Sequence, residues 1–420
     1  MTRHSAMPKD SKTTLTPKLR FPEFQNEPWE VRSIGDFLRE SRIKGSTGAV
    51  ARKLTVKLWG KGVYEKAESL RGSENTQYFR RKAGQFIYSK LDFLNQAFGV
   101  IPPELDGFES TADLPCFDIE EELHPRFFLE YVKRPHFYKR FGEIADGGRK
   151  AKRIQTDTFL SFKICVPTSF SEQQRIAECL STLEELIDAE SRKLDALKNH
   201  KKGLMQQLFP REGETRPRLR FPEFRDAPEW EQRRLGDLVE IATGQVDPKE
   251  PPYCDLPQIG SENIESNTGK IVNVKTAREK GVISGNYVFD KEDVLYSKIR
   301  PALNKVAAPS FKGVCSADIY PVRPNSGSLL RNYLVFLLLS EKFLGYAIRS
   351  SDRGKIPKIN REALLSYEAH VPSVDEQRRI ADCLSSLDDL IAAQSEKLES
   401  LRTHKRGLMQ QLFPNPSEFE

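Results

Sequence analysis

Two short loops combine glycine with clustered lysine and arginine, and they occur at corresponding places in the two halves of the chain. They span residues 146–154 and 352–359. Lysine and arginine neutralise nucleic-acid phosphates, and arginine can also bind both acceptors of a guanine edge. A solvated charged loop is the more common role for such a run, but its recurrence favours DNA contact here. The predicted DNA-binding residues of these loops are Arg149, Lys150, Lys152, Arg153, Arg353, Lys355 and Lys358.

Two Tyr-Ser-Lys segments supply weaker DNA-binding candidates. Residues 86–91 resemble residues 294–299, and the alternation of β-branched and aromatic residues predicts a β-strand in both. The tyrosine of each segment could belong to the core, which would leave only the serine and the lysine exposed. The candidates from these segments, with one arginine just beyond the second strand, are Ser89, Lys90, Ser297, Lys298 and Arg300.

Sequence motifs for catalysis are absent or degenerate. The chain has no GxxxxGK[ST] phosphate loop, which argues against an ATP-driven motor within it. Its six histidines include no HExxH and its six cysteines include no CxxC pair, so we expect reduced cysteines and no metal site. Glu250–Tyr253 resembles the Asp/Asn-Pro-Pro-Tyr/Phe motif of amino-methyltransferases, but glutamate replaces the required first residue. We therefore expect no catalytic residue in this chain.

A 39-residue segment that occurs twice must position these loops. The copies span residues 172–210 and 376–414, and 26 of their 39 aligned positions are identical. Apolar residues recur at alternating steps of mostly three and four, which predicts a long amphipathic helix with a coiled-coil seam in each copy. Polar residues interrupt both seams at matching positions, and such residues tend to fix register and partner.

The two predicted helices are expected to pair with each other as a spacer. At 1.5 Å per residue, each would be a rod of roughly 60 Å. The alternative is two unrelated helices, each buried in its own domain, but the near-identity of the seams argues against it. The central seam residues are Leu180, Leu183, Ile187, Leu194 and Leu197 in the first copy, and Leu384, Leu387, Ile391, Leu398 and Leu401 in the second.

A globular region precedes each helix. Both regions begin with an Arg-Phe-Pro-Glu-Phe motif, at residues 20–24 and 220–224, and we interpret this opening as a structural latch. Many predicted short strands with a few helices indicate an α+β fold. Short helices are expected at residues 125–138 and 329–348. The predicted organisation is a basic tail (1–18), a first head (19–168), a first helix (169–210), a linker (211–217), a second head (218–373), a second helix (374–414) and a tail (415–420).

Composition and charge set broad limits on function. The formal net charge is +6, of which residues 1–20 contribute +4, so the heads are only mildly basic. This permits nucleic-acid binding without requiring it. The sequence contains no run of 18 apolar residues and no apolar centre near its N-terminus, so we expect neither a membrane span nor a secretory signal. A cytoplasmic location is the expectation.

The duplicated helices, with their EQ-RIA-CL-L openings and GLMQQLFP endings, resemble those of type I restriction-modification specificity subunits. The Arg-Phe-Pro-Glu-Phe openings and the Tyr-Ser-Lys strands agree with this resemblance, which covers residues 19–414. It implies two target-recognition domains that bind double-stranded DNA at a bipartite site. It also implies that the two helices pair as an antiparallel coiled coil with pseudo-twofold symmetry.

The resemblance further implies that this chain is not itself an enzyme. Two modification subunits would bind to it and methylate adenine with S-adenosylmethionine. Two restriction subunits would add ATP- and Mg²⁺-dependent cleavage. The chain itself would then bind none of these cofactors.

Two other function classes stay open from the sequence alone. The first is a coiled-coil scaffold whose heads bind proteins and have no DNA specificity. The second is an enzyme with Glu250–Tyr253 as a degenerate methyltransferase site. Salt-dependent, sequence-selective DNA binding would exclude the scaffold. Binding of S-adenosylmethionine by the isolated chain would favour the enzyme.

Overall fold

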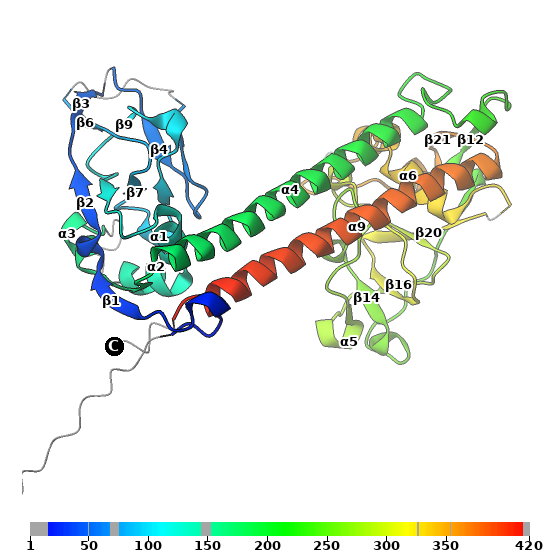
Figure 1. Cartoon of the computed structure of the whole chain (residues 1–420). Coiled ribbons are helices and arrows are strands. Elements are labelled where there is room, and N and C mark those ends of the chain that lie inside the picture. Colours follow the sequence, from blue (N-terminus) through cyan, green and yellow to red (C-terminus); the bar gives the residue numbers. More distant parts are fainter. Residues whose placement is uncertain are drawn as a thin grey trace, which may run out of the picture. The chain divides into compact units, whose positions relative to one another are not determined.

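The computed structural model describes residues 16–48, 50–67, 75–143, 153–325, 327–352 and 354–414. The chain divides into two compact units, one formed by residues 1–190 with 397–420 and the other by residues 191–396. Each unit contains one head and parts of two long helices, α4 (Phe170–Leu208) and α9 (Val374–Gln411) (Figure 1). The predicted α+β fold, with two heads each followed by a long helix, is confirmed.

The head of the first unit is built on a four-stranded sheet with the order β2-β10-β7-β8. A three-stranded sheet with the order β3-β6-β9, a hairpin of β4 and β5, and an antiparallel pair of β1 and β11 complete its strands. The strands are β1 (Trp29–Ser33), β2 (Leu38–Ser41), β3 (Lys44–Thr47), β4 (Leu54–Val56), β5 (Val63–Glu65), β6 (Gln77–Arg80), β7 (Phe86–Tyr88), β8 (Phe98–Val100), β9 (Glu109–Ser110), β10 (Cys116–Ile119) and β11 (Lys163–Pro167). The helices are α1 (Pro125–Val132), α2 (Pro135–Gly142) and α3 (Thr156–Ser161).

The head of the second unit repeats this plan. Its central sheet has the order β13-β20-β17-β18, and β12 pairs with β21 immediately before α9. A further sheet has the order β15-β14-β19-β16. The strands are β12 (Glu231–Arg234), β13 (Val239–Ile241), β14 (Pro257–Ile259), β15 (Lys275–Thr276), β16 (Asn286–Phe289), β17 (Val294–Ser297), β18 (Val306–Ala307), β19 (Gly313–Ser316), β20 (Ile319–Pro324) and β21 (Glu368–Val371). The helices are α5 (Ala277–Lys280), α6 (Arg331–Leu339), α7 (Glu341–Arg349) and α8 (Arg361–Leu365).

The two heads fill their cores with different side chains. In the first head, the fully buried Phe86 on β7 lies with its ring centroid 4.8 Å from Phe128 of α1 and 5.8 Å from Phe159 of α3. In the second head, buried leucines of α6 pack in one cluster with Val294 and Val322 of the central sheet. The same backbone plan is thus held together by aromatic packing in one head and largely aliphatic packing in the other.

Each of the two predicted short helices is divided into two. The segment predicted at 125–138 contains α1 and α2, and Pro135 begins α2 because proline fits the first turn but not a helix interior. The segment predicted at 329–348 contains α6 and α7. Its break lies at Ser340, whose hydroxyl accepts a hydrogen bond from the backbone N–H of Phe343 at 3.3 Å and caps α7.

The long helices pair inside each unit, and two ion pairs in the first unit show that they run antiparallel there. In the first unit, Glu190 of α4 pairs with Lys397 of α9, and Glu184 pairs with Lys405. Residue numbers rise along α4 from 184 to 190 while those of their partners fall along α9 from 405 to 397, so the two helices run in opposite directions. In the second unit, Lys201 of α4 pairs with Asp388 of α9, with 2.5 Å between Nζ and Oδ1.

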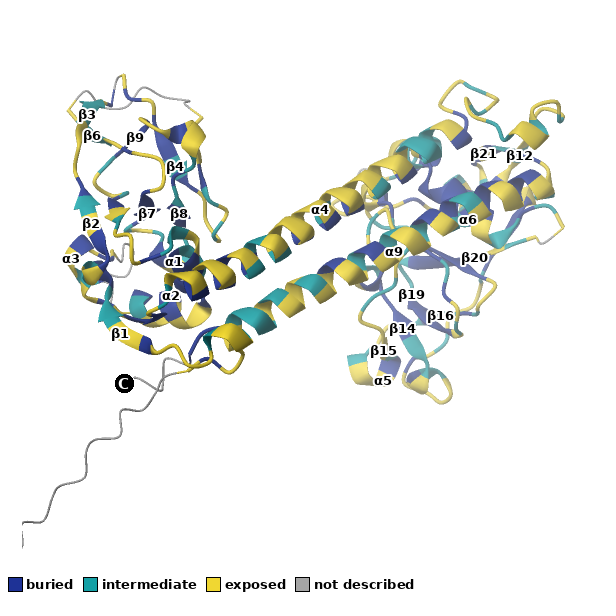
Figure 2. Cartoon of the chain, in the orientation of Figure 1, coloured by how far each residue is buried: buried dark blue, intermediate teal, exposed yellow. Residues whose placement is uncertain are grey.

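Burial along the helices follows the heptad seam (Figure 2). The buried seam residues are Leu180, Ile187, Leu194, Leu384, Leu387 and Leu398, and the half-buried ones are Leu183, Leu197, Ile391 and Leu401. Three polar seam residues, Glu190, Lys201 and Gln394, are also buried. Burial raises the pKa of Asp388 although Lys201 lies beside it, so desolvation outweighs the ion pair at that carboxyl.

The Arg-Phe-Pro-Glu-Phe openings hold the starts of the long helices. Arg20 donates from Nε and Nη2 to the fully buried carboxylate of Glu172 at 2.7 and 2.6 Å, and Trp29 Nε1 donates to Glu172 at 3.2 Å. In the second unit, Arg220 binds Glu376 in the same way at 2.8 and 2.7 Å. The repeated opening therefore positions its head at the first turn of the helix that follows it.

Candidate nucleic-acid interface

Two segments that carry predicted basic residues of the second head are joined through their backbones. The loop that follows β17 forms a β-bridge between Ile299 and Lys358, and Arg300 N–H donates to the carbonyl of Pro357 at 2.7 Å. Ile359 N–H in turn donates to the carbonyl of Lys298 at 3.0 Å. Two loops that lie about 60 residues apart in the sequence are thereby joined. The described predicted residues on the two joined segments are Lys298, Arg300, Lys355 and Lys358.

These basic side chains differ in how freely they can reach a ligand. Arg300, Lys355 and Lys358 are exposed, whereas Lys298 is half-buried with its Nζ 5.2 Å from the ring centroid of Tyr320. Arg300 has a φ of 47°, in the left-handed region. Within the described part of the chain, its guanidinium makes no recorded hydrogen bond or ion pair. Arg300 is therefore exposed with its donors available to a phosphate or a base edge, and its planar guanidinium could bind either in a bidentate way.

The first head joins its corresponding loops through the same backbone hydrogen bonds. Ile154 N–H donates to the carbonyl of Lys90 at 3.1 Å, as Ile359 does to Lys298. Lys90 N–H donates to the carbonyl of Asp113 at 3.0 Å, as Lys298 does to Asp318 at 2.9 Å. Lys90 is half-buried, and Arg153 is exposed with its Nε 3.8 Å from Asp113 Oδ1. The predicted residues Arg149, Lys150, Lys152 and Arg353 lie outside the described residues.

Both candidate serines are buried at the ends of their strands. Ser89 Oγ lies 3.2 Å from Asp92 Oδ2, and Ser297 Oγ lies 2.6 Å from Ser261 Oγ. Tyr88, the tyrosine before Ser89, is also buried and donates its hydroxyl to the carbonyl of Ile154 at 3.0 Å. In this conformation the serine hydroxyls hold the loops in place and do not face solvent.

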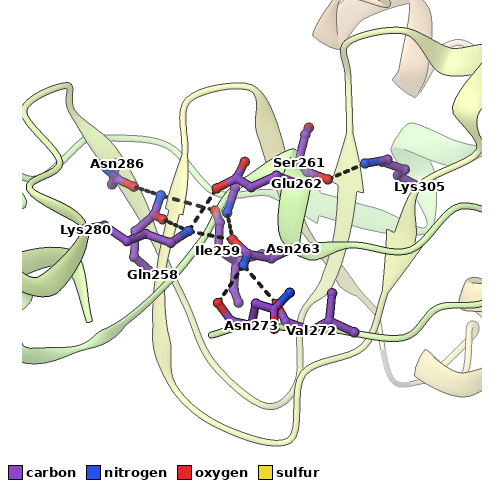
Figure 3. Close-up of polar contacts among 11 residues, drawn as sticks. Gln258, Ile259, Ser261, Glu262, Asn263, Val272, Asn273, Lys280, Asn286 and Lys305 are labelled. Carbon is purple, nitrogen blue, oxygen red and sulfur yellow. Dashed lines mark hydrogen bonds and ion pairs between the residues drawn. The ribbon is translucent and has the colours of Figure 1, made fainter. Parts of the chain in front are cut away.

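A partly buried polar network lies next to the joined segments of the second head. Figure 3 shows Lys280 of α5 donating from Nζ to Asn263 Oδ1 at 2.6 Å, Gln258 Oε1 at 2.7 Å and Glu262 Oε1 at 2.9 Å. These acceptors use all three of the lysine's donors. The network fixes the turn after β14, and Ser261 of that turn accepts at its carbonyl from Lys305 Nζ at 2.5 Å. Because Ser261 also contacts Ser297, the network stabilises the strand end that leads to Lys298.

Sequence reasoning missed a hairpin in each head. Its turn docks on the loop that follows the Tyr-Ser-Lys segment. In the first head, the turn between β4 and β5 docks through Trp59 N–H, which donates to the carbonyl of Asn95 at 2.7 Å. In the second head, the turn after the bridge between Ile264 and Ile271 docks through Asn267 N–H, which donates to the carbonyl of Asn304 at 3.0 Å. The turn residues Trp-Gly-Lys-Gly and Asn-Thr-Gly-Lys were the available sequence signal.

The hairpin turn of the second head also faces α4 across a cavity of about 520 Å³. Asn267 and Asn304 contribute to one part of its lining. From α4, Lys198 and Lys202 contribute exposed amines and Lys201 contributes the amine that binds Asp388. Asp388 and Glu341 also line this cavity, so lysines and carboxylates face one another there.

Possible metal ligands, the Glu250–Tyr253 segment and membrane-spanning helices can each be assessed in the part of the chain that the structure describes. There, no group of three or more His, Cys, Asp or Glu side chains is arranged to hold a metal ion. The Glu250–Tyr253 segment lies in loop and turn structure before β14, with both prolines exposed. No helix among the described residues is long and apolar enough to cross a membrane.

Comparison with known proteins identifies the family. A family model described as "Type I restriction modification DNA specificity domain" matches residues 114–199 and 228–403, which is more than half of the chain. The chain belongs to this family. The family's function is DNA sequence recognition within a type I restriction-modification system, which places that reading ahead of a protein-binding scaffold.

Relatives with the same designation agree with the family match. The chain is 28% identical over 287 residues to the type I restriction enzyme EcoDI specificity subunit of Escherichia coli, covering 62% of each protein. It is 25% identical over 413 residues to the MjaVIII specificity subunit of Methanocaldococcus jannaschii, covering 94% of this chain and 93% of that subunit. The crystal structure of a type I S subunit from M. genitalium shares the fold at 14% identity with a TM-score of 0.58, covering 95% of this chain and 99% of that one.

Proposed function

We propose that this specificity-family chain reads a bipartite DNA target without catalysing a reaction itself. Each head binds one half-site through the surface formed by its Tyr-Ser-Lys strand end and its later basic loop. The observation that carries the proposal is the repeated backbone arrangement, in which Lys90 and Lys298 occupy the same hydrogen-bonded position in two heads of otherwise different sequence. A common scaffold with different side chains is what two readers of different sequences require.

The modest charge of the heads is compatible with this role. Two weak readers on one chain gain affinity because the second binding event is intramolecular. Partner subunits would supply further phosphate contacts. We propose that modification subunits bind this chain and methylate adenine with S-adenosylmethionine. Restriction subunits would use ATP and Mg²⁺. This chain would then bind neither S-adenosylmethionine nor ATP nor Mg²⁺ itself. The proposed ligand is double-stranded DNA, and the proposed location is the cytoplasm.

Exchange of one head tests the proposal. Residues 21–165 would be replaced by the corresponding head of another specificity subunit, and the chain would be co-expressed with its modification subunit. Mapping of methylated adenines across the genome should show one changed half-site and one unchanged half-site. The matched control exchanges the second head, over residues 218–373, and should change the other half.

The exchange also separates the proposal from its rivals. A change in both half-sites, or in neither, would contradict independent reading by the two heads. If the wild-type chain with its modification subunit gave no sequence-selective methylation, a scaffold would be favoured. Binding of S-adenosylmethionine by the isolated chain, with loss of methylation in Tyr253→Ala, would favour an enzyme.

A further inference from the structure

The hairpin turns of the two heads share a closing hydrogen bond and a docked residue with positive φ, but they differ in side chains and in the residues that follow. Gly60 and Gly62 also have positive φ in the first turn, whereas Gly269 does in the second. Lys57 N–H donates to the carbonyl of Gly62 at 2.9 Å in the first turn, and Glu265 N–H donates to the carbonyl of Lys270 at 2.9 Å in the second. Two residues further along, Trp59 has a φ of 62° and Asn267 has a φ of 64°. Both residues then dock on the loop that follows the Tyr-Ser-Lys strand. The two turns therefore present different side chains, tryptophan in one head and asparagine in the other, at a shared docked position with positive φ.

The tryptophan is conformationally unfavourable at this position. Positive φ is common for glycine and is tolerated by asparagine, but for a bulky side chain it is an outlier. Asn267 thus suits its backbone, whereas Trp59 is held against its preference by its own docking bond and by that of Gly60 N–H to the carbonyl of Gln96, at 2.9 Å. Such outliers persist where the surrounding structure fixes them, and they cluster at ligand-binding sites.

Burial within the chain does not compensate for this conformation. Trp59 is 58% exposed, and its neighbour Leu58 is 39% exposed. A tryptophan that served the core would remove most of its ring from water and would usually bond its N–H. The benefit of a tryptophan at this turn must therefore come from something that binds the exposed ring.

The surroundings of the ring indicate a polyanion. Lys57 and Lys61 flank Trp59 and are exposed, with Lys57 Nζ 3.8 Å from the ring centroid of Tyr64. The stem of Lys133, whose amine pairs with Glu130 at 2.9 Å, lies against Gly60. The turn docks on the carbonyls of residues 95 and 96, immediately after the predicted DNA-binding segment at residues 89–90. Asp92, the acidic group nearest along that loop, already accepts hydrogen bonds from Ser89 Oγ and Asn95 Nδ2. An apolar ring with lysines on both sides, next to the basic surface, fits a DNA groove.

We infer that the hairpin turn is a specificity-determining contact in both heads, made by Trp59 in the first and by Asn267 in the second. The inference rests on the proposed function, since it places the turn on the DNA half-site of its own head. The indole can contact a thymine methyl group or wedge between base pairs. Asn267 Oδ1 accepts from Asn304 Nδ2 at 3.1 Å, which leaves its own amide N–H groups to donate to a base-edge acceptor.

Substitution of Trp59 gives a test in which stability and specificity move in different directions. Trp59→Asn and Trp59→Gly would be compared with wild type in the assembly with the modification subunit. Because both substitutes accept positive φ, the melting temperature of the chain should stay the same or rise. Binding to a duplex carrying the mapped target should weaken at least tenfold at a fixed salt concentration. Discrimination against base changes in the first half-site should fall, while discrimination in the second half-site stays at the wild-type level.

Two matched variants complete the experiment. Val31→Ala removes a partly exposed apolar side chain from β1 of the same head and should leave binding unchanged. Asn267→Ala should reduce discrimination in the second half-site alone.

The outcomes separate this inference from the proposed function. If the wild-type assembly binds no DNA sequence selectively, the proposed function fails. If it binds selectively and Trp59→Asn keeps full discrimination at both half-sites, the inference alone is wrong. A fall in melting temperature in both Trp59 variants would make the residue structural and would overturn the inference. Loss of the modification subunit from the purified assembly would do the same, because the ring would then bind protein.

Discussion

At the scale of single residues, the charge pairs at the two helix starts, Arg20–Glu172 and Arg220–Glu376, each contain a carboxylate with almost no exposed surface. The side chain of Glu172 has no exposed surface, and that of Arg20 is 8% exposed. A carboxylate buried to this extent depends on its donors, because transfer out of water is otherwise very unfavourable. The sequence indicated a latch in this opening but not its partner, which lies 152 residues away along the chain.

Arg20→Ala is expected to destabilise the first unit strongly. The substitution leaves Glu172 buried with Trp29 Nε1 as its remaining side-chain donor, which should reduce the free energy of unfolding by about 3–5 kcal/mol. Arg39→Ala is the matched control, since the Arg39–Glu120 pair is largely exposed and should contribute about 0–1 kcal/mol. Chemical denaturation of both variants measures the difference. Equal losses in the two variants would show that burial of Glu172 does not govern the effect.

At the scale of elements, the polar positions in the helix seam decide how α4 and α9 pair. Lys201 is buried in the seam, close to Asp388 and with its Nζ 5.2 Å from the ring centroid of Phe336. At the corresponding position of the other helix, Lys405 lies near Glu184 and Glu130 in the first unit, and burial lowers its pKa. Each seam lysine thus contacts a carboxylate of the partner helix, which favours one register over others.

A double-mutant cycle on Lys201 and Asp388 tests this role in register. Asp388→Leu alone leaves a buried ammonium without its carboxylate and should reduce the free energy of unfolding by about 1–3 kcal/mol. Lys201→Met combined with Asp388→Leu should recover most of that loss, because apolar residues can replace a buried pair. The exposed pair of Arg402 and Glu399 serves as the control and should show a coupling of at most about 0.5 kcal/mol. No recovery in the double variant would mean that packing at Asp388, and not its charge, stabilises the seam.

At the scale of the whole chain, the duplication could be predicted from the sequence, whereas the candidate DNA-binding surface could be predicted only in part. Heptad spacing and near-identical copies predicted both long helices to within two residues of their observed starts, because local periodicity determines them. The convergence of residues 298–300 with 355–359 depends on sheet pairing between distant segments, and no local pattern encodes it. The docked turn at Trp59 was missed for the same reason: its partners at residues 95 and 96 are remote in sequence.

The length of the paired helices should determine the gap between the two DNA half-sites. α4 and α9 each begin in one unit and end in the other, so a matched deletion of one heptad from each, residues 191–197 and 391–397, keeps the antiparallel register. Each helix shortens by about 10 Å, which corresponds to about three base pairs of duplex at 3.4 Å per base pair. Methylation mapping should then show a gap shortened by about that amount. Because three base pairs also rotate the half-site by about a quarter turn, the alternative result is loss of methylation.

Deletion from α4 alone is the control and should abolish activity, because it shifts every seam contact beyond the deletion. An unchanged gap in the matched deletion would show that the helices do not set the spacing.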